Sequence, residues 1–270
     1  MFGRCDMRLV KIVKTSIVVG LAGALGASAA TAATLAALKD GKSIVWVDTD
    51  QKKAVGSVAL ADNAMLVGMD VRPADGKLYG VSASGAIVVV DAKTGKWEKK
   101  SQLSEALPAG ATISIDFNPV ADRMRILSST GMNLRVNVDD GKATVDGSLK
   151  YAESDAAKGT APKVGAGAYT NSIAGTKETA LYNIDGATGM LVKQAPPNDG
   201  VLVGMGKLGV KLDGPVAFDI LADGKGGNTG WLLTGGKLHS VDLKTGAATS
   251  VGAIAGLSGT ISDIAILPGM

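Results

Sequence analysis

Cysteine, histidine and aromatic residues are scarce in this chain of 270 residues, which holds one cysteine, one histidine and 4% aromatic residues. Because Cys5 precedes the expected mature N-terminus, we expect the mature chain to have no disulfide, thiolate metal site or cysteine nucleophile. His239 has no second histidine or cysteine with which to form a zinc site. No nucleophile-elbow sequence supports a Ser-His-Asp triad, and no glycine-rich phosphate loop opens a helix. The sequence therefore predicts no catalytic residue, no metal and no cofactor.

The first 33 residues have the pattern of a secretory signal peptide. An apolar run at 17–25, too short to span a bilayer, is followed by A-x-A patterns at 27–29 and 30–32. Before it stand the basic residues Arg4, Arg8, Lys11 and Lys14. We expect a signal peptide at 1–33 and a single domain at 34–270, located in the periplasm or outside the cell, with no membrane insertion after processing. The alternative is an N-terminal membrane anchor.

Net charge gives no argument for a nucleic-acid partner. The leader carries four basic residues and one acidic residue, which account for the whole net charge of +3. The mature chain is therefore close to neutral, and it lacks the basic balance of a nucleic-acid-binding protein.

Glycine, by contrast, is abundant at 37 residues and marks the turns of a repeating unit. Segment 66–103 reads as four short strands at 67–71, 78–82, 87–90 and 97–103, separated by turns that contain Gly76, Gly85 and Gly95. Asp70 in the first strand has counterparts 46 to 53 residues apart at Asp116, Tyr169, Asp219 and Ala265. Gly95 has counterparts at Gly141, Gly200 and Gly246. Four-strand units with this period are typical of a β-propeller.

The two ends of the chain complete one further unit. Segment 34–60 aligns without a gap to 77–103, and 260–267 supplies the missing first strand. The other blades are expected at 66–103, 112–149, 164–208 and 214–254, with a long loop at 151–163. The sequence thus predicts an all-β, monomeric five-bladed β-propeller closed by a composite blade made from both termini, which removes open sheet edges. The alternative is a β-sandwich or an open array of hairpins.

Several segments resemble one known family over the whole mature chain: GMDVRPADGKLYG, DFNPVADRMRILSSTGMNLRVNVDDG, AYTNS, LYNID and PPNDGVLVGMGKLGV. The family comprises exported bacterial proteins, known only as a domain of unknown function with a propeller-like repeat. Its most specific part is the DFNP…DR…N.R.N…DG signature at 116–141. The resemblance implies export and fold, and it supplies no activity or catalytic residue.

The second predicted blade carries polar residues where the first is apolar. They are Asp116, Asn118, Arg123, Arg125, Asn133, Arg135 and Asn137. Spacing of two places each set on one face of its strand. This face is either a buried network that fixes blade order or a site for a small anion bound by arginine. We expect Arg125 to lie nearest the solvent, with Arg123 and Arg135 structural.

Aspartates also recur on the innermost strands, which line a propeller's channel. Asp70, Asp116 and Asp219 can act as a carboxylate pair for glycoside hydrolysis or bind Ca²⁺. The alternative is that each accepts hydrogen bonds from local backbone amides.

The sequence favours a binding or interaction module of the bacterial envelope over an enzyme, with a small anion or an envelope protein as its partner. Two alternatives stay open: a secreted hydrolase or lyase that uses the channel carboxylates, and a structural envelope protein. Convergent, exposed aspartates in the channel would favour the enzyme, and dispersed, capped ones the binding module.

Overall fold

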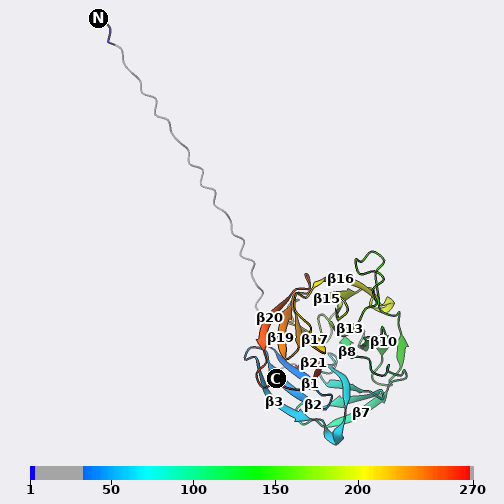
Figure 1. Ribbon diagram of the computed structural model, residues 1–270. Coiled ribbons are helices and arrows are strands. Elements are labelled where there is room, and N and C mark those ends of the chain that lie inside the picture. Colours follow the sequence, from blue (N-terminus) through cyan, green and yellow to red (C-terminus); the bar gives the residue numbers. More distant parts are fainter. Residues whose placement is uncertain (4–32, 268–270) are drawn as a thin grey trace.

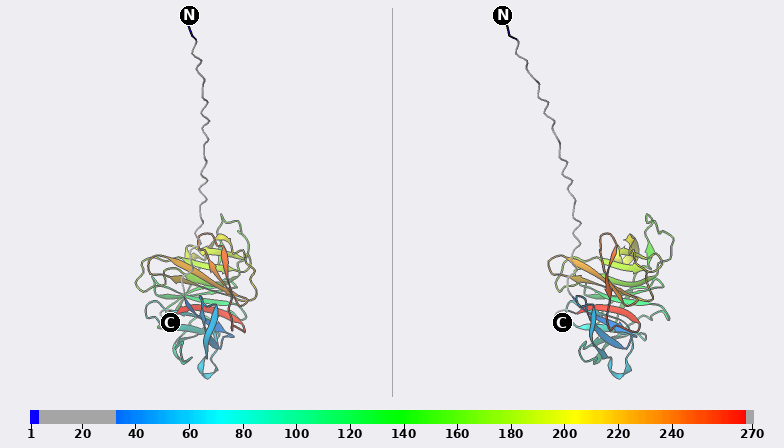
Figure 2. Two further views of the ribbon diagram at one scale, coloured as in Figure 1. Left: turned by 90° about the vertical axis from the view of Figure 1, so that its left-hand side faces the viewer. Right: turned by 60° about the vertical axis from the view of Figure 1, so that its left-hand side comes forward.

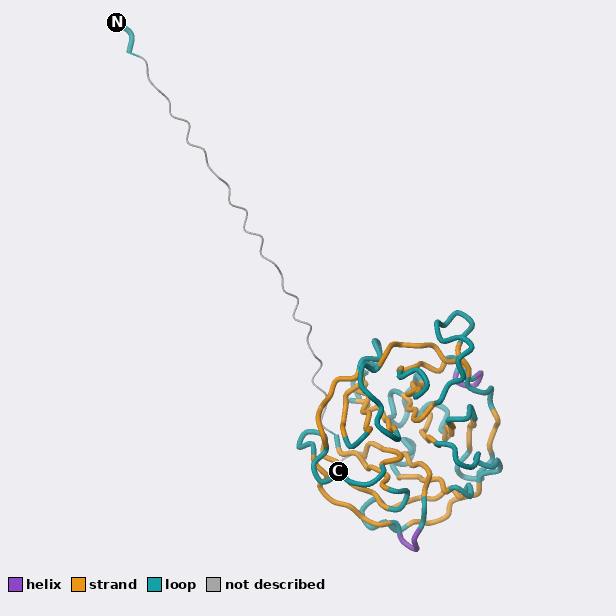
Figure 3. Tube along the Cα trace, viewed as in Figure 1, coloured by secondary structure: helices purple, strands orange, loops and turns teal. Residues whose placement is uncertain are grey.

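The computed structural model describes residues 1–3 and 33–267. The predicted signal peptide falls mainly on 4–32, outside the described residues, so its cleavage stays a prediction. The described chain forms a ring of five sheets, and its only helices are the 3-10 turns Ala61–Asn63 and Pro197–Asp199 (Figures 1 and 3). No helix within 33–267 is long and apolar enough to cross a membrane.

Each sheet contains a blade of four antiparallel strands, to which blade three adds a fifth strand at its rim. In blades one to four the first strand of the blade lies at the centre of the ring (Figure 1). Blade one contains β4 (Leu66–Val71), β5 (Leu78–Ser82), β6 (Ala86–Val90) and β7 (Trp97–Gln102). Blade two contains β8 (Ile113–Asn118), β9 (Arg123–Ser128), β10 (Asn133–Val136) and β11 (Ala143–Val145). Blade three contains β13 (Val164–Tyr169), β14 (Leu181–Asp185), β15 (Met190–Gln194) and β16 (Val201–Lys207). Blade four contains β17 (Val216–Ala222), β18 (Asn228–Thr234), β19 (Lys237–Val241) and β20 (Ala248–Ala253).

The fifth blade is composite, as predicted. Its strands are β21 (Ile261–Leu267), β1 (Thr34–Lys39), β2 (Ser43–Asp48) and β3 (Lys53–Ala59), in that order from the centre. β1 and β21 pair antiparallel, with partners from Thr34↔Leu267 to Lys39↔Ile261. The blue strand β1 and the red strand β21 lie side by side in both views of Figure 2. The five-bladed propeller closed by both termini is confirmed.

Apolar side chains pack between neighbouring blades. β6 has the sequence AIVVV, and such β-branched runs suit strands covered on both faces. One buried cluster lies at each of the five blade interfaces. At the interface of blades one and two, for example, Tyr79 meets Phe117 edge to face with ring centroids 5.3 Å apart. The cluster between blades two and three has the fewest buried residues, and polar side chains fill the rest of that interface.

The glycine that recurs before each fourth strand has a positional reason. Gly95 has φ +71, and a Cβ there would lie 2.0 Å from the carbonyl oxygen of Ala59 in the preceding blade. Its own carbonyl accepts a hydrogen bond from the Ala61 N–H at 2.9 Å. In the composite blade, Lys52 occupies the same position with φ +53, and its carbonyl accepts the Ala255 N–H at 2.8 Å. The repeat of glycine thus encodes a backbone contact between successive blades.

One expectation of the sequence is wrong in detail. The predicted loop at 151–163 loses its first residue to β12 (Lys150–Tyr151), which pairs parallel with β16 at the rim of blade three. Tyr151 explains this attachment, because its buried hydroxyl donates a hydrogen bond to Asp185 Oδ2 at 2.6 Å.

Candidate functional site

The inner strands β4, β8, β13, β17 and β21 stand next to one another around the axis. Each is the edge strand of its own sheet, so the N–H groups on its free side, which faces the axis, have no neighbouring strand to accept their hydrogen bonds. Side chains from the neighbouring blade provide them. Asp70 Oδ2 accepts the Phe117 N–H at 2.8 Å, and Asp116 Oδ1 accepts the Tyr169 N–H at 3.0 Å. These aspartates thus accept backbone amides near the axis from the neighbouring blade, and not only the local amides that the sequence suggested.

The same arrangement continues in blade four and the composite blade. Asp219 Oδ2 accepts the Ile266 N–H at 2.7 Å, and Asp263 Oδ2 accepts the Met69 N–H at 3.0 Å. Sequence reasoning missed Asp263, which is 2% exposed, because it stands two residues before the repeat position at Ala265. Phe117 and Ile266 donate the cross-blade bond from the residue after the repeat position, whereas Met69 donates from the residue before Asp70. In blade three the donor is Tyr169 itself.

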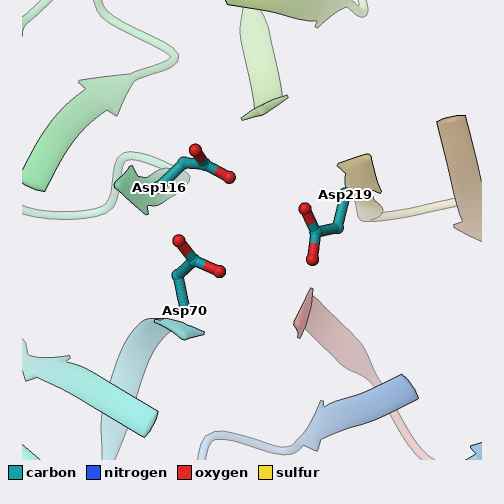
Figure 4. A group of neighbouring side chains, drawn as sticks. All are labelled: Asp70, Asp116 and Asp219. Atoms are coloured by element: carbon teal, nitrogen blue, oxygen red, sulfur yellow. The ribbon is translucent and has the colours of Figure 1, made fainter. Parts of the chain in front are cut away.

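Three of these aspartates converge (Figure 4). One carboxylate oxygen each of Asp70, Asp116 and Asp219 lies within 4.8 Å of the other two. The three residues are 7%, 4% and 5% exposed, respectively. The sequence placed them on innermost strands, and the structure brings them together from blades one, two and four. On the sequence criterion, convergent, exposed aspartates favour an enzyme and dispersed, capped ones favour a binding module. The observed aspartates are convergent and capped, so their arrangement does not distinguish the two functions.

Burial and mutual repulsion shift the ionisation of this cluster. Burial raises the pKa of Asp70 and Asp116 well above the usual value, and the neighbouring Asp219 carboxylate adds to this in both. Burial raises the pKa of Asp219 to about 6, although the N–H groups of Ile266 and Ile220 act against it. Burial likewise raises the pKa of Asp263. The oxygens lie within 4.8 Å of one another, so at an effective dielectric constant near 20 each ionised pair is repelled by at least about 3.5 kcal/mol.

A pocket of about 640 Å³ opens onto this cluster from one end of the axis. Its floor includes Asp70 and Asp219, and its walls are the ends of β4, β17 and β21 and the start of β1. We call it the mouth pocket. Its lining contains four aspartates and neither a basic nor an aromatic residue: Ala33, Thr34, Asp48, Asp50, Asp70, Val71, Pro73, Gly76, Ser172, Ile173, Ala174, Asp219, Ile220, Leu221, Ala222, Ile266 and Leu267.

The predicted polar face of blade two contains a closed network at the interface with blade three. Arg125 is 2% exposed, and its guanidinium donates to Tyr169, Asn133, Asp146 and Asn198 at 2.6 to 3.1 Å. The expectation that Arg125 lies nearest the solvent is wrong, because these four protein acceptors enclose it.

Arg135 is the more open member of this network. Its Nε and Nη2 donate to Asp146 at 2.7 and 2.9 Å, while 37% of its side chain stays exposed. Burial raises the pKa of Asp146, but hydrogen bonds from Arg135 and Arg125 outweigh this and hold it below its usual value. A small anion at this face stays a prediction, for which Arg135 is the accessible arginine.

Of the remaining members of the predicted face, Asn133 belongs to this network, whereas Asp116, Asn118 and Arg123 lie outside it. Asp116 turns to the axis, and Asn118 Oδ1 accepts the N–H groups of Val120 and Ala121 in the turn after β8. Arg123 is exposed and donates to backbone carbonyls of the same turn. Asn133 is buried and joins Arg125 to blade three through the Pro197 carbonyl. The alternation along each strand placed these residues on one face, but it could not show which of them lie in the turns at the strand ends and which lie in the buried middle.

His239 is 5% exposed, and its Nδ1 has no hydrogen-bond partner among the described residues. Burial lowers its pKa. Its side chain has no hydrogen bond or ion pair to a carboxylate within the described part of the chain.

Comparison with known proteins gives a family and a fold. The sequence profile of a family described as "Domain of unknown function (DUF4394)" matches residues 26–265. A protein of unknown function from Bacteroides thetaiotaomicron is similar in structure, with a TM-score of 0.52 and 16% identity over 88% of this chain. This chain spans 65% of that structure's length. A protein of unknown function from Bacteroides caccae matches with a TM-score of 0.43 and 13% identity, over 88% of this chain and 100% of that one. No curated protein matches.

Proposed function

The chain belongs to the family described as a domain of unknown function (DUF4394), so we propose a function from its own site. We propose that it is a ligand-binding module of the cell envelope and that its ligand occupies the mouth pocket. The volume of about 640 Å³ suits a small molecule. The expected export places this module in the periplasm or outside the cell.

The composition of the mouth pocket carries the proposal. Asp48, Asp50, Asp70 and Asp219 all contribute to its lining, and no lysine or arginine does. A ligand that supplies positive charge or several hydrogen-bond donors is favoured here, whereas an anion is repelled. Ile266, Leu267 and the ends of β17 give the same pocket an apolar wall, which excludes water from one side of the ligand.

A hydrolase that uses the axial carboxylates fits less well. Both oxygens of Asp70, and both of Asp219, already accept backbone N–H groups. A catalytic acid or base needs a proton path to the substrate that such capping restricts. The pocket also lacks an aromatic platform for a sugar. Trp46 and Trp97 lie outside this pocket and donate to the backbone carbonyls of Ala92 and Ala61.

A thermal-shift screen tests the proposal, since a ligand that binds only the folded state raises the melting temperature. The panel contains organic amines, sugars and organic anions. We expect amines to raise the melting temperature most. Ala174→Trp narrows the mouth pocket and should abolish the shift, whereas Ala121→Trp, an exposed alanine outside this lining, should retain it. A shift that persists in Ala174→Trp, or no shift with any compound, would contradict the proposal.

A further inference from the structure

We propose that a divalent cation, with Ca²⁺ the best fit, binds on the propeller axis between Asp70, Asp116 and Asp219. This inference rests on the proposed function, because the ion would form the floor of the mouth pocket and supply the positive charge that its acidic lining favours.

The donor set and its spacing fit this ion. Three carboxylates offer only hard oxygen ligands, which Ca²⁺ and Mg²⁺ prefer, and the described cluster contains no histidine or cysteine. Ca²⁺ takes oxygens at about 2.3–2.6 Å, so three oxygens spaced evenly around one ion are about 4.0–4.5 Å apart. The three carboxylate oxygens lie within 4.8 Å of one another, which is compatible with that spacing. Mg²⁺ bonds of about 2.0–2.1 Å would bring three such oxygens to about 3.5–3.6 Å of one another, in a stricter octahedral geometry than Ca²⁺ needs.

Asp116 gives a second observation that points to a ligand. It is 4% exposed, its Oδ1 accepts the Tyr169 N–H, and its Oδ2 accepts no hydrogen bond from residues 33–267. Its carboxylate points toward Asp70 and Asp219 (Figure 4). Most of this side chain is buried and its Oδ2 has no donor in the described part of the chain, so a positively charged partner in front of that oxygen would stabilise it. A cation at the centre of the three residues meets that need.

The charge balance leads to the same conclusion. None of Asp70, Asp116, Asp219 and Asp263 forms an ion pair within the described part of the chain. Without a cation such buried carboxyl groups are driven toward the neutral form, whereas a bound cation stabilises them as carboxylates. Backbone N–H groups fix the orientation of all three carboxylates before any ion arrives, so little ordering is required on binding.

Access and open coordination positions connect the ion to the mouth pocket. Asp70 and Asp219 line the pocket, whereas Asp116 lies behind them. Ca²⁺ takes 6–8 oxygens, more than three carboxylates provide in single-oxygen contacts. Water or an oxygen of the pocket's ligand therefore completes the shell from the mouth side.

Calorimetric titration of the EDTA-treated protein with CaCl₂, together with melting curves in CaCl₂, tests this site. Asp116→Asn is the cleanest variant, because Asn keeps the Oδ1 acceptor for the Tyr169 N–H and removes only the charged, unpartnered side. We expect its Ca²⁺ affinity to fall about tenfold or more and the Ca²⁺-induced rise in melting temperature to disappear. Asp91→Asn is the control: it alters an exposed turn aspartate whose Oδ1 accepts two backbone N–H groups, and it should leave both readouts unchanged.

The outcomes separate this inference from the proposed function. Absent Ca²⁺ binding, unchanged binding in Asp116→Asn, or binding lost equally in Asp91→Asn would each overturn the axial site. Tighter binding of Mg²⁺ than of Ca²⁺ would overturn the choice of ion. Asp219→Asn serves as the second variant if Asp116→Asn does not fold. Ala174→Trp should still bind Ca²⁺ although it no longer binds the organic ligand. If the parent protein binds amines but not Ca²⁺, the axial ion site is refuted and the proposed function is not.

Discussion

Replacing Arg125 with methionine tests whether the blade two–blade three network holds the ring together. The guanidinium forms an ion pair with Asp146 at 2.6 Å between side chains that are 3% and 5% exposed. It also donates to three neutral groups, on Tyr169, Asn133 and Asn198. Methionine fills part of the volume but leaves the buried Tyr169 hydroxyl and Asn133 Oδ1 without this donor. Among the described residues, Asp146 then has only the more exposed Arg135 as an ion-pair partner. Removing one partner of a buried pair costs about 3–5 kcal/mol, and we expect Arg125→Met to fall in that range.

Arg135→Met is the matched comparison. It removes two hydrogen bonds to the same carboxylate, from a side chain that is 37% exposed. Because Asp146 keeps Arg125 in this variant, and water reaches the vacated side, the loss should be about 1–2 kcal/mol. Arg125 should therefore matter more than Arg135, the reverse of what the sequence alone suggested for the two positions.

Urea denaturation at pH 7 measures both variants against the parent, and equal slopes make the midpoints comparable. Asp146→Asn should remove most of the difference between the two arginines, because both depend on this carboxylate. An Arg135→Met variant that is as unstable as Arg125→Met, or an Arg125→Met loss below about 1 kcal/mol, would show that the network does not stabilise the fold as argued.

Three further predictions concern the blade contact, the closure and the axis. Gly95→Ala should lower the free energy of unfolding by more than about 1 kcal/mol and Lys52→Gly should raise it slightly, since both positions have positive φ. A melting temperature that rises in Gly95→Ala, or falls in Lys52→Gly, would contradict this. Deleting residues after Thr260 removes β21 and should abolish cooperative unfolding, so a truncated chain that melts like the parent would refute closure. In EDTA, the raised pKa of Asp219, about 6, means that the folded state holds its proton more tightly than the unfolded state. Its stabilisation is full below about pH 4 and is lost as the pH rises through 6, a change of about 3 kcal/mol; urea midpoints that show the same pH dependence in Asp219→Asn would contradict it.

The sequence by itself determined the propeller. Strand periodicity, turn glycines and the match of 34–60 to 77–103 depend on contacts within a blade and between successive blades, which recur along the chain at a fixed spacing. Repeated local contacts of this kind leave a readable period. For the same reason, Lys52 could be aligned with Gly95 before its φ of +53 was known.

Only the tertiary structure decided what the polar residues do. The convergence of Asp70, Asp116 and Asp219 depends on the angle at which five blades meet, which no spacing within one blade records. Asp263 departs from the repeat position and carried no periodic signal. Arg125 is enclosed because Asn198, 73 residues away, reaches it from blade three. Burial and pairing of a charge depend on all of its neighbours in space, whereas strand formation depends mostly on neighbours in the sequence.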